Sequence, residues 1–591
     1  MNNKWKPSVL WLMGGGLFTY CIVLTIMSGN FGFDGDDWWV LGWAYWHDFP
    51  SSILEYAKDF LRPVEGIYCM SMFEMFGFNR IAFHFASLTL LATSCLLMGR
   101  CLFKAFPERS SFVVLATMLA FFLPMVSCLT YVVFTDNSRV SVLLFWLAVL
   151  GFQSWGEKPS WLRLSSGICL YLLSFLTYES PSLLIFTIPL FVWPIHTRRK
   201  IISDRSFFTI LGSAIFGSFG VALVLRYTLM SGGVIDAVGL TPSPKLILAY
   251  LGLLPFYLVA PFTWSPEKSW PVLSGIVMTL WVIFIIYPEQ KWLEIKRQRN
   301  ETLYIGLLGL AISFLGMAPY QIAGYGSSDP TIVDTVFAKF GMIDDRHPAW
   351  FNFNEASRIY SSASYGIAIL ISVAATVWKR AIVRNTAQIL IAIAIGSMAV
   401  FHAGLSLDWK EASLIRNKVL RSLVAKAPSV QNGTNFIFVD LEFYHKRAAV
   451  IRGWSGLREL IRMLYNDSSL GAWYVYPFVT AWPNTSHQQA IILPAGFVSR
   501  GIELDHPVPP ETILIFQRQG TKLLPLNKLS SKNSFIENGI SWQGCDRLNS
   551  NFSRITHSCV LNAGHRSNNP SNSGLFSSLE LTGKSFPQKP K

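Results

Sequence analysis

Twelve long apolar stretches dominate this sequence, and each approaches the length that a helix needs to cross a membrane. A helix spans the roughly 30 Å hydrocarbon core with about 20 apolar residues. Because backbone groups in lipid must be satisfied internally, and no alternating barrel pattern is present, we predict helices. The composition agrees, since 51% of residues are hydrophobic and only 14% are charged, which excludes an ordinary soluble enzyme. The stretches begin near Ser8, Ile81, Ser111, Val140, Leu164, Pro181, Ser206, Leu246, Ser269, Thr302, Ile359 and Asn385.

Basic residues gather in every second loop between these stretches. If the N-terminus is cytoplasmic, the cytoplasmic loops hold 18 Lys and Arg against 6 Asp and Glu, whereas the outer loops hold 10 against 17. Cytoplasmic loops are the basic ones in membrane proteins, so this orientation is the predicted one. The net charge of +14 then needs no nucleic-acid partner. The basic segments are 1–7, 100–110, 157–163, 196–205, 288–301 and 379–384.

One stretch, residues 246–264, does not fit this alternation. If it spanned, the basic segment 291–299 would be forced outside, and Pro255 and Pro261 also interrupt it. We therefore expect a re-entrant or interfacial helix pair on the outer face. The prediction is a mostly α polytopic bundle of about eleven spans in the cytoplasmic (inner) membrane, formed by residues 1–405.

Two long outer loops and a C-terminal region complete the predicted organisation. The loop 29–80 has Trp-rich and amphipathic segments that suit interfacial helices, and the second large outer loop covers residues 321–358. Residues 406–565 mix helical and strand-like segments, which predicts a small extracytoplasmic α/β or α+β domain. The expected helices cover 414–426 and 456–465, and the expected strands cover 436–439, 473–476, 490–493 and 513–516. Residues 566–591 are expected to be disordered, and Cys545 and Cys559 of the exported tail could form a disulfide.

An acidic cluster just after the first span carries the clearest chemical signal. Asp34, Asp36 and Asp37 lie within four residues. Clustered carboxylates raise each other's pKa or await a cation, which suits a general base or a metal site. Asp also caps helix N-termini, so a purely structural role is an equal alternative at this point.

Further charged residues recur in the outward loops that follow. They are Arg62, then Asp136 and Arg139, then the hairpin residues Tyr178 and Glu179. Each alone has a structural explanation: Arg62 could extend to the interface, Asp136 could cap a helix, and Glu179 could be a loop charge. Their recurrence on one side of the membrane predicts that they converge there.

This order of features resembles the GT-C superfamily of polytopic glycosyltransferases, which use polyprenyl-phosphate-linked sugars. The matching features are a basic N-terminus, one span, a long outer loop with Asp36-Asp37 and Arg62-Pro63, the short loop with Asp136, the Tyr178-Glu179 hairpin and an exported C-terminal domain. The sequence is similar to bacterial members related to protein O-mannosyltransferases, aminoarabinose transferases and O-antigen-modifying glucosyltransferases. The resemblance covers roughly residues 1–405. The mannosyltransferases have Asp-Glu where this chain has Asp36-Asp37, so which of the two is the base stays open.

The resemblance implies transfer of a sugar from a polyprenyl-phosphate donor to a lipid, glycan or protein acceptor on the outer face, with inversion at the anomeric carbon. Asp36 or Asp37 would be the general base. Arg62, Arg139, Arg226 and Arg358 would bind the donor phosphate, and Asp34, Asp136, Tyr178 and Glu179 would support them. No cofactor is certain. A divalent cation at Asp344, Asp345 and His347 is a weaker expectation than a simple polar loop.

Two other classes compete with this hypothesis. An O-antigen polymerase or ligase also has many spans and a long outer loop, but usually relies on basic residues in that loop. A lipid-linked-glycan transporter or flippase places ionisable residues inside its spans and often has inverted repeats. The predicted spans here are nearly free of charge at their centres, and no repeat relates the two halves.

Overall fold

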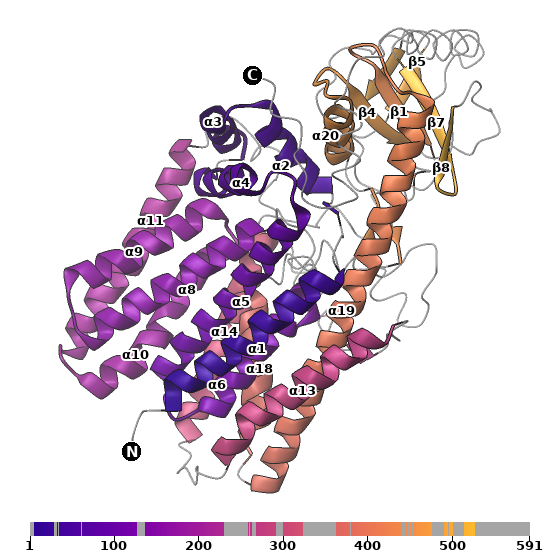
Figure 1. The fold of residues 1–591 in the computed structure, drawn as a ribbon. Helices are drawn as coiled ribbons and strands as arrows, with labels where there is room; N and C mark the ends of the chain where they lie inside the picture. The colour runs from indigo at the N-terminus through magenta and orange to yellow at the C-terminus, as the bar shows by residue number, and fades with distance from the viewer. Residues whose placement is uncertain are drawn as a thin grey trace.

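The protein is a helical bundle with a long helical extension that leads to a small β-sheet (Figure 1). Most of the described residues are helical. The computed structural model describes residues 5–28, 32–33, 35–60, 62–126, 136–229, 258, 261–262, 268–290, 299–322, 362–378, 380–439, 441, 444–446, 448–451, 454–475, 490–493, 496–499 and 513–525.

Seven helices within these residues are long and apolar enough to cross a membrane. They are α1 (Trp5–Ser28), α5 (Arg80–Ala105), α8 (Asp136–Glu157), α11 (Asp204–Leu229), α13 (Ser269–Gln290), α14 (Arg299–Ile322) and α19 (Ala381–Lys426). Shorter elements complete the bundle: α6 (Ser110–Phe122), η1 (Pro124–Val126), α9 (Trp161–Thr177), η3 (Ser182–Thr187), α10 (Ile188–Arg199) and α18 (Ala363–Thr376). Eleven of the twelve predicted stretches therefore coincide with helices, which supports membrane association. The twelfth, residues 246–264, lies almost wholly outside the described residues.

Burial separates an inner helix from the outer ones. Every residue of α6 from Phe112 to Phe122 is buried, and α6 contacts α1, α5, α13, α18 and α19. By contrast, α11, α13 and α14 expose large apolar side chains, among them Phe216, Leu280 and Leu307. A helix that is apolar all round must be covered by protein or by lipid. The outer helices thus have the surface that a bilayer would cover.

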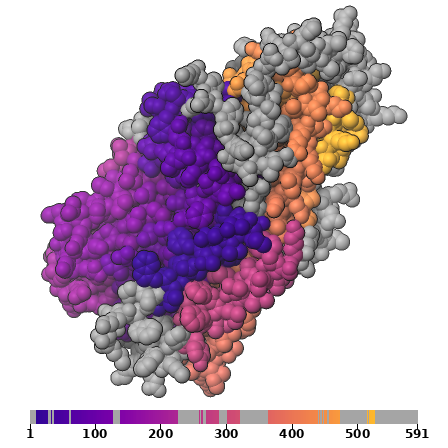
Figure 2. Space-filling view, viewed as in Figure 1, coloured from indigo at the N-terminus to yellow at the C-terminus, as the bar shows by residue number. Residues whose placement is uncertain are grey.

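Small residues let the bundle helices approach closely, as is common for helices in membranes. Gly275 of α13 and Gly396 of α19 face each other, and a Cβ added to either would lie 2.6 Å from the other's carbonyl oxygen. Gly16 of α1 packs directly on the indole of Trp281 of α13. Figure 2 shows α1, in indigo, beside α13, in pink, on the face viewed. The missing side chain at Gly16 therefore lets α1 approach α13 closely.

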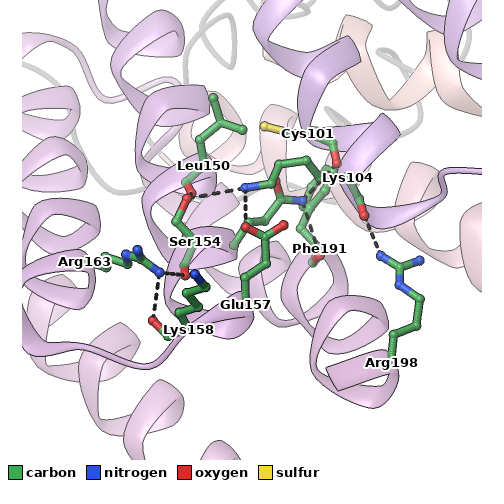
Figure 3. A network of polar contacts seen from close by, with 10 residues as sticks. Cys101, Lys104, Leu150, Ser154, Glu157, Lys158, Arg163, Phe191 and Arg198 are labelled. Carbon is green, nitrogen blue, oxygen red and sulfur yellow. Dashed lines mark hydrogen bonds and ion pairs between the residues drawn. The ribbon is translucent and has the colours of Figure 1, made fainter. Parts of the chain in front are cut away.

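Segments from four predicted cytoplasmic loops meet at one end of the bundle, and Figure 3 shows residues from three of them. Arg198, at the end of α10, donates to the carbonyl oxygens of Lys104 and Ala105 at 2.5 and 2.8 Å, which closes the end of α5. Lys104 also lies 3.2 Å from Glu157 of α8. Nearby, Arg109 Nη2 lies 2.8 Å from Glu301 of α14. Four of the six segments that the charge pattern assigns to one side therefore share one end, here called the basic end.

Three short helices follow α1 at the opposite end of the bundle. They are α2 (Gly35–Trp46), α3 (Phe49–Phe60) and α4 (Pro63–Phe76). Pro63 occupies the first turn of α4, where its missing N–H is not needed. Asn79 then caps α5 by accepting from the Ala82 N–H at 3.2 Å. The predicted helical content of loop 29–80 is confirmed.

The C-terminal region begins without a break in α19. This helix has 46 residues, about 69 Å at 1.5 Å per residue, and continues through the predicted boundary at residues 405/406. The sheet beyond it has the strand order β4-β1-β7-β8, in which β1 pairs in parallel with both β4 and β7 and β7 pairs antiparallel with β8. The strands are β1 (Asn435–Val439), β2 (Tyr444–His445), β3 (Ala448–Ala449), β4 (Gly471–Val475), β5 (Ala490–Leu493), β6 (Gly496–Ser499), β7 (Ile513–Gln519) and β8 (Lys522–Pro525).

A helix connects two of the parallel strands. α20 (Trp454–Tyr465) lies between β1 and β4 in sequence and packs on the sheet, where the rings of Tyr465 and Phe436 stack at 5.5 Å. Parallel neighbours need such a crossover. The four strand segments predicted from sequence fall on β1, β4, β5 and β7, and the two predicted helical segments fall within α19 and α20.

Candidate functional site

The acidic segment after α1 forms the start of α2. Asp37 lies in the first turn of this helix and its side chain is fully buried, with 0% exposure. A carboxylate in the first turn interacts favourably with the helix dipole. Asp36 belongs to the same turn, but its side chain lies outside the described residues, as does Asp34. Asp37 is therefore packed inside protein rather than turned toward bulk water.

Two of the aromatic residues that follow Asp37, Trp38 and Tyr45, are also buried. The Trp38 indole donates to the Phe33 carbonyl oxygen at 3.0 Å, and its ring lies 5.4 Å from the Phe33 ring. Further along, Tyr45 is buried and donates to Asn466 at 3.0 Å. The Trp-rich helix is thus enclosed by protein along this face, because helix α20 of the C-terminal region lies against it.

A second charged group forms where α4 begins. Arg62 Nη2 lies 3.0 Å from Glu179 Oε1, and Arg62 Nη1 lies 3.4 Å from Glu65 Oε2. The guanidinium also stacks 4.4 Å from the centroid of the Tyr178 ring. Arg62 and Glu179 are 117 residues apart in sequence. The structure therefore brings together three of the predicted site residues: Arg62, Tyr178 and Glu179.

Two residues of this group were not predicted from the sequence. Glu65 is only 2% exposed, and it accepts a hydrogen bond from the Tyr56 hydroxyl at 2.7 Å. The spacing of Arg62 and Glu65, three residues apart at a helix start, was an available signal. The burial of Glu65 was not, because it depends on α3 packing against α4, where Tyr56 lies close to Gly66.

Burial and the carboxylates of Glu65 and Glu179 shift the pKa values of Arg62 and Tyr56. Partial burial opposes the charge on Arg62, but the carboxylates of Glu179 and Glu65 outweigh that effect and raise its pKa well above the usual value. Burial also raises the pKa of Tyr56 well above 10.0, and the neighbouring Glu65 raises it further. Arg62 is thus cationic and Tyr56 a neutral donor throughout the working pH range.

Tyr56 also connects this group with α2. Its ring lies 6.3 Å from the Trp43 ring, and Trp43 follows Asp37 by six residues, or about 9 Å along the helix. Ser180, next to Glu179, is hydrogen-bonded to Ser362, which directly precedes α18. Loop 29–80, the hairpin at 178–182 and the start of α18 therefore meet at one end of the bundle, here called the acidic end. The meeting of loop 29–80 with this hairpin is part of the convergence that the loop pattern predicted.

The remaining predicted residues are placed differently or are not described. Arg139 is 2% exposed in the first turn of α8, close enough to interact electrostatically with Cys21 of α1 and Tyr365 of α18. The same end of α8 also contacts the hairpin, because Ser141 donates to the Tyr178 carbonyl oxygen at 3.0 Å. Asp136 begins α8 and Arg226 lies in α11, but their side chains are outside the described residues. Also outside are Arg358, Asp344, Asp345, His347, Cys545 and Cys559.

The described residues hold no group of three or more His, Cys, Asp or Glu side chains placed to bind a metal ion. What the acidic end does offer is a permanent cation, 22% exposed, that two carboxylates neutralise. An anionic group that displaced Glu179 would meet a guanidinium suited to bidentate contact. Comparison of the sequence with protein-family models and with curated proteins finds no match.

Proposed function

We propose that this protein is a polytopic membrane glycosyltransferase of the GT-C type. It transfers a sugar from a polyprenyl-phosphate donor to a lipid, glycan or protein acceptor. One observation carries the proposal: Arg62, Tyr178 and Glu179 converge at the end of an apolar bundle where α2 holds the buried Asp37. Charged groups from separate loops beside lipid-facing helices are what a membrane-anchored phosphate donor requires.

The proposed topology has about eleven spans, a cytoplasmic N-terminus and the C-terminal region outside the cytoplasm. The separation of the two ends of the bundle supports it. Segments 100–110, 157–163, 196–205 and the start of α14 meet at the basic end, which the positive-inside rule assigns to the cytoplasm. Arg62 and Glu179 then lie at the outer face.

The proposed chemistry assigns three roles. One carboxylate of the Asp36-Asp37 pair accepts the proton of the acceptor hydroxyl, whose oxygen attacks the anomeric carbon as the bond to the donor phosphate breaks. Arg62 stabilises the negative charge that develops on the leaving phosphate. To do so, Arg62 gives up its ion pair with Glu179 and pairs with the phosphate instead. The prenyl chain stays in lipid along exposed apolar helices. With one base and no enzyme nucleophile, the configuration at the anomeric carbon inverts.

The test is transfer of labelled sugar from polyprenyl-phosphate donors to cell-envelope fractions. Asp36→Asn and Asp37→Asn are compared with Asp204→Asn at the basic end. This variant is a control because the amide oxygen of the new asparagine can still accept the hydrogen bond from His196. We expect one variant of the pair to lose roughly 10²–10⁴-fold in rate, the usual range for a general base. Full activity in both variants, with the protein folded, would remove the proposed base.

A lipid-linked-glycan transporter remains the second candidate, because Arg139 is buried among bundle helices and buried ionisable residues mark transport pathways. The two functions differ in their product. A transporter moves an intact donor between leaflets, so reconstituted protein would make labelled donor accessible to an external enzyme without forming a glycosylated acceptor.

A further inference from the structure

We infer that helix α20 of the C-terminal region is a positioning element for α2, and that Gly456 and Glu459 set the place of the acidic pair. The two helices run side by side in the same direction. At the start of α2, the backbone of Gly35 packs against Gly456. Further along, Gly42 packs against the Glu459 side chain, and near the end of α2 Tyr45 is hydrogen-bonded to Asn466. The contact thus extends over the whole length of α2. The catalytic consequence of this inference rests on the proposed function, but the structural one does not.

The contact at Gly456 leaves no room for a side chain. A Cβ on Gly456 would lie 2.5 Å from the carbonyl carbon of Gly35 and 2.6 Å from its Cα. Real Cβ atoms do not approach backbone so closely, so any larger residue must displace the first residue of α2. Because Gly35 precedes Asp37 by only two residues, that displacement moves the buried carboxylate.

Polar contacts fix the other end of α2. Glu459 is buried, accepts from the Trp46 indole at 3.3 Å and is held by Arg462 at 2.7 Å. A Cβ on Gly42 would lie 2.7 Å from Glu459 Oε2. Tyr45 donates to Asn466 at 3.0 Å. These directional contacts set the rotation of α2 about its axis as well as its distance from α20.

The chain that enters α2 is held by α19. The buried Arg416 guanidinium lies 5.8 Å from the Trp38 ring, donates to Ser413 Oγ at 3.2 Å and reaches the Val450 carbonyl oxygen at 3.4 Å. A Cβ on Gly32 would lie 2.6 Å from Ser413 Oγ. Asp37 thus lies in a helix that α19 holds on its N-terminal side and α20 holds along its length.

α20 can fix α2 because α20 is itself fixed. It belongs to the parallel β1-α20-β4 unit, and its last residue, Tyr465, donates to the Ala427 carbonyl oxygen at 2.7 Å just beyond α19. The Tyr465 ring stacks on Phe436 of β1. The sheet therefore helps to hold α2 in place, through α20, in addition to the bundle helices.

Cysteine accessibility tests this inference without any enzymatic assay. In an Asp37→Cys protein, we expect the buried thiol to react slowly with a maleimide, as followed by mass spectrometry of the peptide that contains residue 37. Adding Gly456→Ala should raise the labelling rate at least tenfold. Adding Gly306→Ala should not, because that helical glycine has nothing within 4 Å of an added Cβ. Equal labelling in all three proteins would overturn the inference.

Hydrogen exchange provides the second measurement, for the case that the cysteine variant does not fold. With Asp37 intact, Gly456→Ala should accelerate exchange of the α2 amides while leaving those of α5 and α8 unchanged. Exchange that increases throughout the bundle would indicate general destabilisation and would also overturn the inference.

The catalytic consequence is a separate result. If the proposed function holds, Gly456→Ala should lower kcat about tenfold or more and leave the donor KM near the wild-type value, because Arg62 lies in a different group. Absence of transfer in the wild type would contradict the proposed function while leaving the labelling result intact. Increased labelling with an unchanged kcat would overturn the positioning role.

Discussion

The two ends of the bundle use charge in different ways. At the basic end, Arg198 donates to two backbone carbonyl oxygens and Arg109 makes two hydrogen bonds to Glu301. At the acidic end, the partners of Arg62 among the described residues are two carboxylates and an aromatic ring. A backbone carbonyl is fixed by its helix and Arg109 is only 8% exposed, whereas Arg62 is 22% exposed, so another anion can approach it and replace a carboxylate. The basic end therefore joins helices, and the acidic end can exchange a partner.

The largest expected difference between the ends comes from removing one arginine at each. Arg62→Ala should lower transfer by roughly 10²–10³-fold, the usual cost of losing a group that stabilises transition-state charge. Arg109→Ala should leave the rate per folded molecule unchanged and lower the free energy of unfolding by about 1.5–3 kcal/mol, as expected for hydrogen bonds to a charged group. Initial rates and thermal unfolding in detergent measure the two effects. The comparison fails if Arg109→Ala reduces the rate per folded molecule as strongly as Arg62→Ala does.

Tyr56→Phe tests the acidic end through the pH dependence of the free energy of unfolding. Loss of the hydrogen bond leaves buried Glu65 without its phenol donor and should lower the free energy of unfolding by about 1–3 kcal/mol at neutral pH. The pKa of Tyr56 is raised in the folded protein, so its contribution is complete below pH 10.0 and is lost as the pH rises above that value toward the folded pKa. The difference between wild type and variant should therefore shrink above pH 10. A difference that is constant with pH would contradict this coupling.

Glu179→Gln gives the smallest expected effect. If Glu179 and the donor phosphate compete for Arg62, removing the carboxylate charge should lower the donor KM by up to about fivefold, because a partly exposed ion pair is worth up to about 1 kcal/mol. Glu157→Gln is the matched control, since it removes a similarly placed acid from Lys104 at the basic end. Donor titrations of both variants give the answer. A higher KM in Glu179→Gln would mean that Glu179 supports donor binding instead of competing with it.

Much of the fold follows from local sequence. The apolar stretches that begin near Ile81 and Ser269 became α5 and α13, because chain length and hydropathy alone set that choice. The alternation of basic and acidic loops also predicted which helix ends lie together, as the contacts of Arg198 and Arg62 illustrate. The strand at 436–439 was predicted by its run of aromatic and β-branched residues.

The candidate site was predictable only in part. The meeting of Arg62 with Glu179 followed from loop positions, but the packing of α2 against α20 did not, because the two helices are more than 400 residues apart in sequence. Local periodicity contains no information on such a contact. The same is true of Arg139, whose place near α1 and α18 follows from helix packing and not from its loop.

The continuity of α19 has a mechanical consequence. No proline interrupts its 46 residues, so it behaves as a stiff lever with one arm among the bundle helices and the other beside the sheet. A rod of about 69 Å that tilts by about 10° moves its far end by roughly 12 Å relative to its near end. A bilayer that changes in thickness tilts its helices. A change in lipid composition would thereby tilt α19 and shift the position of α20 against the start of α2.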